Sequence, residues 1–455
     1  MKQYDILVIG SGSGMAIVDE SLSHGFKVAL VDRGPFGGTC LNLGCIPSKM
    51  LIYPADRIAE IQEAGKLGIS AQIISIDFPS IMKRMRDSIG ESQEHMRHGI
   101  SHLDGLDLYN AQGHFIDDYT VDVDGEKVKG DKVVMASGSR PLIPPIKGLD
   151  KVDYLTNETV LRLNELPDSL IIIGGGYIAV EYGHFFAAMG TRVTLVEMAD
   201  RLVLAEEPEI SEVLKQELSK RMQVLTGAAA DEVIQESKGV SVLVKAGKAK
   251  RRRKLFAQNL MVAVGRRSNA DLLKIENTGV ETDQRGFITV NEYLETSKKD
   301  IWALGDANGQ QMFTHVANRE AAVVAHNIIH EEKVKMDYSA IPHAVFSHPQ
   351  IASVGMTEEQ AGKSHDILVG MANYMDVAKG EAMMEESGFA KAIVEKHSGK
   401  ILGFHIIGPS SPILIQEVVN AMTSGGNIDE IGQGIHIHPA LTEIIESTLA
   451  NIEWD

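Results

Sequence analysis

The chain contains two cysteines, Cys40 and Cys45, and they lie in one short stretch, 37–49. Four residues separate them, so a bridge between them would close a small ring. A pair of thiols takes up and releases two electrons by opening and closing a disulfide. Buried structural thiols and a zinc site are the alternatives. A structural zinc site needs two further ligands and no second cysteine pair exists, so we predict no metal site.

The cysteines follow a pattern of strand, glycine turn and helix that occurs twice. A short apolar run at 6–9 ends in the first glycine turn, and another at 170–173 ends in the second. Such runs are typical of strands buried on both faces of a parallel sheet. Glycine lets the backbone approach a pyrophosphate, whose charge then lies at the positive end of a helix. The glycines concerned are Gly10, Gly12 and Gly14 in the first copy, and Gly174 and Gly176 in the second.

Each copy continues to a second apolar run that ends in an acid, Asp32 in the first and Glu197 in the second. Each acid lies about 20 residues after the first glycine of its copy. This is the spacing expected of the carboxylate that binds an adenosine ribose. Two copies with matching acids indicate two dinucleotide sites. The third glycine position of the pattern holds Ala179 in the second copy, which the pattern allows, and Met15 in the first, which departs from it.

The two copies also end alike, because an apolar run leads into small residues at 133–138 and again at 260–265. The second copy is therefore expected to be inserted into the first. After about residue 341 the pattern changes to alternating strands followed by helices. We predict an α/β fold with two Rossmann-like dinucleotide-binding domains and a C-terminal α+β domain. The expected bounds are 1–148 with 268–340 for the first domain, 149–267 for the second and 341–455 for the third.

Composition limits the partners. The formal charge is -18, and such an acidic surface repels polyphosphate, so we expect neither a nucleic-acid nor a membrane partner. The longest apolar region, 170–190, is interrupted by glycines and Glu181, which argues against a membrane span. The apolar run near Met1 is too short for a signal peptide, so we expect a cytoplasmic protein. The basic stretch 248–254 is interpreted as a solvated hairpin and not as a nucleic-acid site.

Two dinucleotide sites and one dithiol form a complete electron path, because nicotinamide hydride, flavin and disulfide each carry two electrons. At this point the stretch 37–49 resembles the redox signature of the class I pyridine nucleotide-disulfide oxidoreductases. The resemblance covers essentially the whole chain, including 296–307 and 436–443. These flavoproteins include dihydrolipoamide dehydrogenase, glutathione reductase, mercuric reductase and mycothione reductase. The resemblance implies FAD in the first domain, NAD in the second, and a homodimer formed through the third.

The resemblance also implies roles for the reactive residues. Cys40 would be the interchange thiol that attacks the substrate disulfide, and Cys45 would be the charge-transfer thiol stacked against the flavin. His438 with Glu443 resembles the acid-base pair that the partner subunit supplies. A thiolate and not a thiol attacks a disulfide, so the chemistry needs a base, and histidine titrates in the useful range.

Further residues take implied places around the cofactors. Lys49 and Glu181 resemble the ion pair beside flavin N5, and Tyr177 resembles the aromatic residue that covers the nicotinamide pocket in some members. The residues implied to bind FAD or NAD are Gly10, Gly12, Gly14, Asp32, Gly38, Thr39, Ser137, Gly138, Asp306, Gly174, Gly176, Tyr177, Glu197 and Gly265.

Smaller signals bear on the nucleotide and the substrate. Glu197 favours NADH, because a carboxylate repels the 2′-phosphate of NADPH. The NADPH-using glutathione reductases carry arginines where this chain has Met198 and Leu204. The stretch 436–439 resembles dihydrolipoamide dehydrogenase, so lipoamide is the predicted substrate, whereas 10–15 resembles mycothione reductase. The alternatives are an NAD(P)H-dependent reductase of another small disulfide, and a subunit docked to a lipoyl-bearing protein in an acyl-transfer complex.

Overall fold

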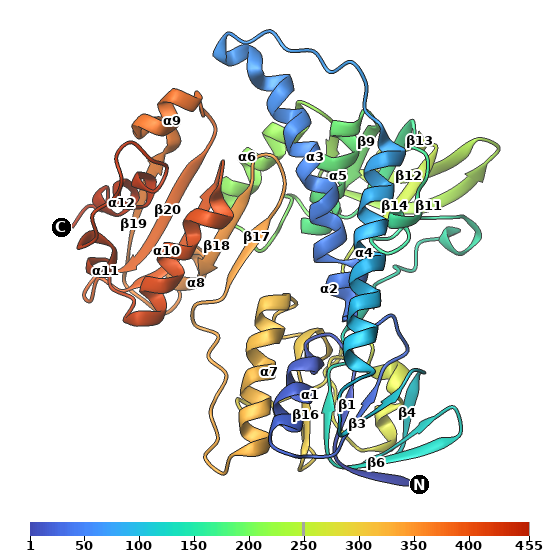
Figure 1. The fold of residues 1–455 in the computed structure, drawn as a ribbon. Helices are drawn as coiled ribbons and strands as arrows, with labels where there is room; N and C mark the ends of the chain where they lie inside the picture. The colour runs from blue at the N-terminus through green and yellow to red at the C-terminus, as the bar shows by residue number, and fades with distance from the viewer. Residues whose placement is uncertain (248–250, 455) are drawn as a thin grey trace. The chain divides into compact units, whose positions relative to one another are not determined.

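The computed structural model describes residues 1–247 and 251–454. The chain forms two compact units, each assembled from three segments (Figure 1). Unit 1 comprises Met1–Ser48, Met82–Leu142 and Gly265–Asp337. Unit 2 comprises Lys49–Ile81, Ile143–Val264 and Tyr338–Asp455. The first glycine turn and both cysteines therefore belong to unit 1, whereas the second glycine turn and the C-terminal segment belong to unit 2. The finer division into three domains stays a prediction.

A seven-stranded sheet forms the centre of unit 1. Its strands in spatial order are β3 (Leu106–Tyr109), β2 (Val28–Val31), β1 (Lys2–Ile9), β6 (Glu126–Met135), β5 (Thr120–Val123) and β4 (Gly113–Asp117), with β16 (Ile301–Ala303) also paired to β6. β1 is parallel to both of its neighbours, and Leu7 and Val8 are fully buried. The continuous apolar runs therefore fill both faces of the sheet, as predicted. Helices α1 (Gly14–Ser23) and α7 (Thr314–Ile329) lie side by side (Figure 1).

Unit 2 repeats this plan in a four-stranded parallel sheet. Its strands in spatial order are β10 (Gln223–Leu225), β9 (Arg192–Val196), β8 (Ser169–Ile173) and β14 (Asn259–Val262). Beside them lie an antiparallel sheet of β11 (Ala228–Glu236), β12 (Gly239–Ala246) and β13 (Arg251–Ala257), and the helices α5 (Tyr177–Met189) and α6 (Pro208–Ser219). The basic stretch 248–254 leads into β13, and its residues 248–250 lie outside the described part.

The two copies make equivalent hydrogen bonds at their glycine turns. The amide of Gly10 donates to Val31 at 2.9 Å, and the amide of Gly174 donates to Val196 at 2.9 Å. Each sheet continues on the other side of its central strand with a parallel strand, β6 in the first copy and β14 in the second. The mixed α/β fold expected from the repeat is confirmed by the structure.

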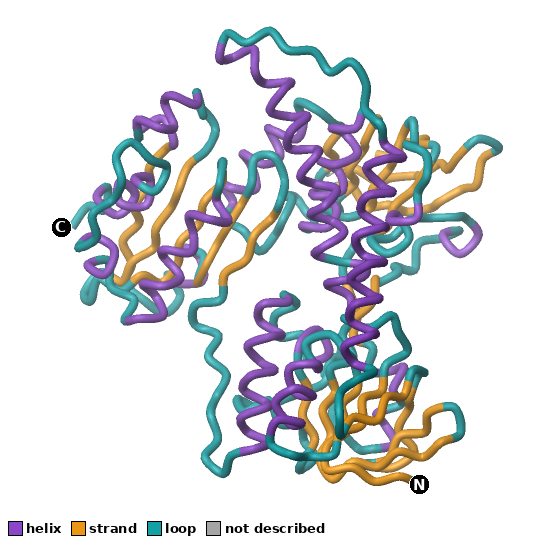
Figure 2. The backbone as a smooth tube through the Cα atoms, in the orientation of Figure 1, coloured by secondary structure: helices purple, strands orange, loops and turns teal. Residues whose placement is uncertain are grey.

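The C-terminal segment of unit 2 forms a five-stranded antiparallel sheet. Its strands in spatial order are β17 (Pro342–Val345), β18 (Ile351–Gly355), β21 (Ile401–Ile407), β20 (Phe389–Glu395) and β19 (Ile367–Asn373). Figure 2 shows these strands in orange beside purple helices, of which α10 (Ser411–Ser424) and α12 (Glu443–Ala450) pack on the sheet. They cover an apolar core that includes Phe404 and Ile406. The expected α+β character of this segment is present.

The remaining elements complete the described chain. They are β7 (Ser139–Pro141) paired with β15 (Arg266–Ser268), the helices α2 (Gly38–Leu43), α3 (Cys45–Glu63), α4 (Phe78–Ile100), α8 (Glu358–Ala361), α9 (Ala378–Met383) and α11 (Asp429–Gly432), and single turns of 3-10 helix. Among the described residues, no helix has the length and apolar character needed to cross a membrane.

Candidate active site

The two cysteines lie at the junction of two helices in unit 1. Cys40 belongs to α2, and Cys45 is the first residue of α3. Neither cysteine forms a disulfide in the structure, and Cys40 is half-buried whereas Cys45 is exposed. A hydrogen bond with Cys45, together with burial, raises the pKa of Cys40. The start of a helix stabilises a thiolate at Cys45, so the pair can hold one proton and one negative charge between its two sulfurs.

Thr314 is a neighbour of the dithiol that the sequence pattern did not indicate. It begins α7, and its Oγ1 lies 3.4 Å from Sγ of Cys45. The hydroxyl can donate to a thiolate at Cys45, which would stabilise the charged form. A threonine at a helix start is too common a feature to mark a site by itself.

The first glycine turn leaves no room for side chains. Gly10 has a φ of +106°, and a Cβ there would lie 2.2 Å from the carbonyl oxygen of Ala136. Gly38 has a φ of +66°, and its Cβ would lie 2.7 Å from Cα of Gly12. Beside this turn, the hydroxyl of Ser137 is buried without a partner in the described chain. Bare backbone at a helix start together with an unsatisfied hydroxyl fits the pyrophosphate of a dinucleotide.

The first helix packs on the sheet through Gly14. A Cβ at Gly14 would lie 3.0 Å from Cγ1 of Val8 on β1. In the second copy, Ala179 occupies the position that corresponds to Met15 and is fully buried in α5. Met15 is therefore compatible with a dinucleotide turn, because the close approach of helix and strand occurs at the residue before it.

The acid of the first copy lies over the glycine turn. Oδ2 of Asp32 accepts a hydrogen bond from the amide of Ser11 at 2.6 Å, and Oδ1 accepts one from the amide of Gly34 at 2.6 Å. These contacts orient the carboxylate at the carboxyl end of β2, where the acid of a dinucleotide fold binds the ribose.

Asp306 follows β16 and is held by side chains from the β7–β15 pair. Its Oδ2 accepts a hydrogen bond from Ser139 Oγ and lies 3.4 Å from Nε of Arg266. The turn that carries Asp306 is fixed by Glu320, a fully buried acid of α7 whose Oε2 accepts from the amide of Gly305 at 2.5 Å. Glu320 was not among the predicted residues, although an acid on the apolar face of a helix is a signal for such a role.

The second glycine turn lies in unit 2. A Cβ at Gly174 would lie 2.2 Å from the carbonyl oxygen of Ala263. A Cβ at Gly175 would lie 2.7 Å from the side chain of Glu197, so the predicted ribose acid lies directly against the turn. Gly176 immediately precedes α5, and the half-buried Tyr177 begins it. Predicted residues of the nucleotide site are thus gathered at one end of the β8–β14 sheet.

The loop after Glu197 presents apolar side chains to the surface. Met198 is 77% exposed and Leu204 is 58% exposed. Arg201, between them, donates from Nη2 to the carbonyl oxygen of Leu204 at 3.1 Å, and its Nη1 is buried. The arginine of this loop is therefore turned toward its own backbone.

Lys49 and Glu181 form an ion pair in unit 2. Nζ of Lys49 on α3 lies 2.7 Å from Oε2 of Glu181 on α5. The other oxygen, Oε1, accepts from the amide of Phe346 at 3.0 Å, and the ammonium lies 4.5 Å from the Phe346 ring centroid. The buried carboxylate is thus held by two partners, and the lysine is held by a charge and an aromatic face.

His438 and Glu443 also form a pair in unit 2. Nδ1 of His438 lies 2.7 Å from Oε1 of Glu443, while Oε2 accepts from the amide of Ala440 at 2.9 Å. The hydrogen bond from His438 lowers the pKa of Glu443, so the carboxylate stays ionised. The imidazole is 72% exposed. With Nδ1 held by the carboxylate, Nε2 is the nitrogen available to a substrate.

The predicted residues thus fall into four groups. The dithiol and the first dinucleotide turn, with Asp32 and Asp306, belong to unit 1. The second dinucleotide turn, the Lys49–Glu181 pair and the His438–Glu443 pair belong to unit 2. Gly138 and Gly265 have φ values of +67° and +132° at the turns that follow β6 and β14. Thr39 lies in α2 beside Cys40.

Comparison with known proteins identifies relatives over the whole chain. Residues 4–321 match the pyridine nucleotide-disulphide oxidoreductase family, and residues 341–449 match the dimerisation domain of that family. Mycothione reductase of Mycobacterium tuberculosis (strain ATCC 25618 / H37Rv) is 39% identical, with 99% of this chain and 100% of the relative covered. Dihydrolipoyl dehydrogenase of Geobacillus stearothermophilus is 35% identical, with 97% and 94% covered.

Two further relatives are more distant. Mercuric reductase of Staphylococcus aureus is 32% identical, with 99% of this chain and 82% of the relative covered. Among solved structures, the HOCl-induced flavoprotein disulfide reductase RclA from Escherichia coli has a TM-score of 0.86 and 27% identity, with 98% of this chain and 99% of that chain covered.

Proposed function

Because this chain belongs to the pyridine nucleotide-disulfide oxidoreductase family, we propose that it reduces a small disulfide through FAD and the Cys40–Cys45 pair. The observation that carries the proposal is the position of two thiols at the junction of α2 and α3, with Oγ1 of Thr314 3.4 Å from Sγ of Cys45. Two thiols this close in sequence can be oxidised to a disulfide and reduced again, a two-electron change.

The family membership confirms the predicted fold class and the predicted cofactor types, because members bind FAD and take electrons from NAD(P)H. FAD, when bound, supplies a two-electron carrier between the hydride donor and the disulfide. In this chain Gly10, Gly12 and Gly38 would face its pyrophosphate, and Asp32 would bind its adenosine ribose. Asp306 would bind the ribityl-pyrophosphate region.

The thiol chemistry is a pair of exchange steps. The thiolate of Cys40 attacks one sulfur of the substrate disulfide, so the substrate S–S bond breaks and a mixed disulfide forms at Cys40. The leaving thiolate takes a proton from the His438 imidazolium. Cys45 then attacks the sulfur of Cys40, which releases the second thiol and leaves the Cys40–Cys45 disulfide. The substrate has gained the two electrons that the dithiol lost, and FAD, when bound, would return two electrons from NAD(P)H to the Cys40–Cys45 disulfide.

His438 acts as the acid and base of these steps. Its Nδ1 is bound by Glu443 at 2.7 Å, which fixes the ring orientation and directs Nε2 toward the substrate. The ring is largely exposed in the single chain, as expected of a residue that serves the dithiol of a partner subunit. The match to the dimerisation domain supports a homodimer.

We propose NADH as the nucleotide. Glu197 lies against the second glycine turn, where it would bind the ribose hydroxyls and repel a 2′-phosphate. Met198 and Leu204 offer no charge to a phosphate, and Arg201 is bonded to the loop itself. A specific phosphate site would need a guanidinium or ammonium directed outward from this loop.

Two substrates are candidates, each favoured by a different observation. Full-length identity of 39% to mycothione reductase favours mycothione, a low-molecular-weight disulfide. The residues of 436–439 and the carboxylate of Glu197 favour lipoamide, the substrate expected from the sequence. We place mycothione first and lipoamide second, because the mycothione reductase identity extends over nearly the whole chain. A docking role beside a lipoyl-bearing protein would accompany only the second.

The experiment measures NADH and NADPH consumption by the purified yellow protein with mycothione and with lipoamide. We expect NADH-dependent turnover of one of them. Cys45→Ser and Cys40→Ser should each abolish disulfide turnover while both keep part of the reduction of a dye by NADH. A Cys45→Ser variant that reduced the disulfide at the wild-type rate would contradict the mechanism.

A further inference from the structure

Four polar side chains form a line across one face of the C-terminal sheet. His343 on β17 pairs with Ser353 on β18. Ser353 pairs with His405 on β21, which pairs with Lys391 on β20. Ser353, His405 and Lys391 are each 1% exposed. Because side chains alternate along a strand, this polar row (His343, Ser353, His405 and Lys391) lies on the face opposite the core that α10 and α12 cover.

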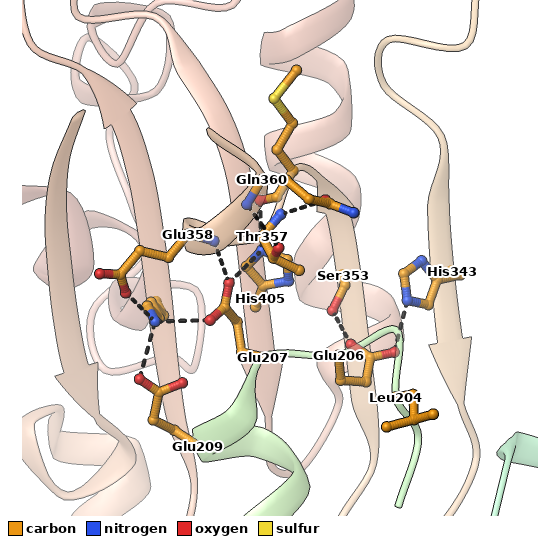
Figure 3. Close-up of polar contacts among 12 residues, drawn as sticks. Leu204, Glu206, Glu207, Glu209, His343, Ser353, Thr357, Glu358, Gln360 and His405 are labelled. Atoms are coloured by element: carbon orange, nitrogen blue, oxygen red, sulfur yellow. Dashed lines mark hydrogen bonds and ion pairs between the residues drawn. The ribbon is translucent and has the colours of Figure 1, made fainter. Parts of the chain in front are cut away.

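Glu206 occupies one end of the polar row (Figure 3). Its Oε1 lies 2.7 Å from Nε2 of His343, and its Oε2 accepts from Oγ of Ser353 at 2.5 Å. The carboxylate is 2% exposed. Burial opposes ionisation, but the contacts with His343 and Ser353 outweigh it, so the pKa of Glu206 is lowered. Both oxygens of this buried charge are therefore satisfied by the row.

Glu207 occupies the other end. Its Oε2 lies 2.9 Å from Nζ of Lys391, and its Oε1 accepts from the amide of Glu358 at 2.6 Å. The same ammonium lies 3.2 Å from Glu209 and 2.6 Å from the side chain of Glu358. The carboxylates of Glu207, Glu209 and Glu358 are close enough together to hold a metal ion, but the ammonium of Lys391 already lies among them. The cluster is therefore a closed ionic contact.

The two glutamates end the loop that follows the ribose acid Glu197. The amide of Val203 donates to the carbonyl oxygen of Gly175 at 2.8 Å, and the amide of Glu206 donates to Val203 at 2.8 Å. The loop 198–205 is thus held on one side by the second glycine turn and on the other by the polar row. Of its two exposed large apolar residues, Leu204 lies between these attachments and Met198 precedes both.

The β17–β18 hairpin also contacts Glu181. Phe346, the residue after β17, donates its amide to Oε1 of Glu181 at 3.0 Å. One hairpin of the C-terminal sheet therefore contacts two parts of the nucleotide-binding segment, the start of α5 through Glu181 and the end of the 198–205 loop through Glu206. A shift of the hairpin would move both.

We propose that the polar row positions the loop 198–205 for the adenosine end of the nicotinamide nucleotide and thereby sets nucleotide affinity. This inference rests on the proposed nucleotide site. His343, Ser353 and Lys391 are positioning residues, because they act on the nucleotide through Glu206 and Glu207. Loss of a contact in the polar row allows the loop 198–205 to occupy other positions. Nucleotide binding must then order the loop, which lowers the affinity for the nucleotide.

The test uses the complete holoenzyme and the variants Ser353→Ala, His343→Gln, Lys391→Met and Lys391→Arg. The KM for NADH is measured with a dye as acceptor, and the inhibition constant is measured for ADP-ribose, which lacks the nicotinamide. We expect both constants to rise by about three- to tenfold in the first three variants. The kcat and the KM for the disulfide should stay within about twofold, and Lys391→Arg should restore most of the affinity because it keeps the charge.

Two matched controls alter residues of the same sheet domain away from the loop. Ser411→Ala removes a buried hydroxyl that donates to Gly408 at 2.7 Å. His365→Gln changes a half-buried histidine whose Nδ1 lies 3.0 Å from Glu395. Both should leave the KM for NADH unchanged, even if they lower the melting temperature, because neither contacts the loop or its glutamates.

The outcomes separate the two proposals. Folded Ser353→Ala and His343→Gln variants with an unchanged inhibition constant for ADP-ribose would overturn the role of the polar row. If Lys391→Met does not fold, these two variants alone test that role. An equal rise of the KM values for NADH and for the disulfide would also overturn it, since that indicates general loosening. A wild-type protein that consumed neither nucleotide would contradict the proposed function instead.

Discussion

His436 and His438 lie two residues apart, yet only one of them can reach a substrate. The side chain of His436 is 7% exposed, and its Nε2 lies 2.8 Å from Glu417. His438 is 72% exposed and keeps Nε2 available, because Glu443 holds Nδ1. The buried histidine is therefore held by Glu417, whereas the exposed one is the predicted acid-base residue.

His438→Gln should reduce disulfide turnover by about 100- to 10,000-fold, the usual contribution of a general acid or base. NADH-to-dye reduction should remain within about twofold, because that reaction needs no proton at a leaving thiol. Steady-state rates with both acceptors provide the measurement. The control His397→Gln alters another exposed histidine, which is 80% exposed. Equal losses with both acceptors would exclude the assigned role.

At the scale of elements, a buried polar network joins α3 to α5 and to the loop after β17. Nε2 of His184 on α5 lies 2.9 Å from Asp56 on α3, and Nδ1 lies 2.9 Å from Nη1 of Arg221. Nε2 of His348 lies 2.8 Å from Oε1 of Glu63, at the end of α3. Burial lowers the pKa of His184, so its ring is neutral and its two nitrogens have different roles. The network holds the two helices that carry Lys49 and Glu181.

The Glu63→Gln variant should show a weaker dependence of the free energy of unfolding on pH in the acidic range. The hydrogen bond from His348 holds the pKa of Glu63 at about 2, below the ordinary 4.5. A depressed carboxyl pKa stabilises the folded state above the ordinary value, and this contribution is lost as the pH falls through about 2. Above pH 5, the free energy of unfolding of the wild type should therefore be larger than that of the variant by about 1 kcal/mol. This difference is small because the Glu63–His348 pair is partly exposed to solvent.

Urea unfolding between pH 2 and pH 7 measures this difference. Glu60→Gln is the matched control, since Glu60 lies on the same helix and pairs with Arg57 at the surface. A difference in the free energy of unfolding between the wild type and Glu63→Gln that did not decrease toward pH 2 would contradict the lowered pKa of Glu63.

At the scale of the whole molecule, the single chain exposes apolar side chains that a second copy would cover. Ile435 is 101% exposed and Ile437 is 77% exposed, on either side of the buried His436. Ile413 and Trp454 are further exposed residues of the segment that matches the dimerisation domain or follows it. Exposed apolar groups on a segment that matches a dimerisation domain are typical of a homodimer interface.

Mixed dimers test whether His438 serves the partner subunit. Subunits with Cys45→Ser and subunits with His438→Gln are each inactive toward the disulfide. If the base comes from the partner, a mixed dimer has one site with intact cysteines and an intact histidine. Co-refolding equal amounts should then restore about a quarter of wild-type turnover, because half of the dimers are mixed and each has one working site. A base that acted within its own subunit would restore none.

The repeat, the dithiol and the family could be predicted from the sequence, because they depend on short-range spacing. A glycine turn after a buried strand, an acid about 20 residues later and two nearby cysteines are local patterns with local physical causes. The pairs Lys49–Glu181 and His438–Glu443 were expected from the resemblance, and the structure places the members of each 2.7 Å apart. Their roles stay predictions.

Tertiary structure alone decided which distant residues meet. Thr314 reaches Cys45, and Glu320 reaches Gly305, through the packing of α7 and not through any spacing along the chain. The polar row depends on the register of four antiparallel strands, since a shift of one residue would turn each of its side chains to the opposite face. A sequence states which residues are polar, but strand register and helix packing decide which of them face one another.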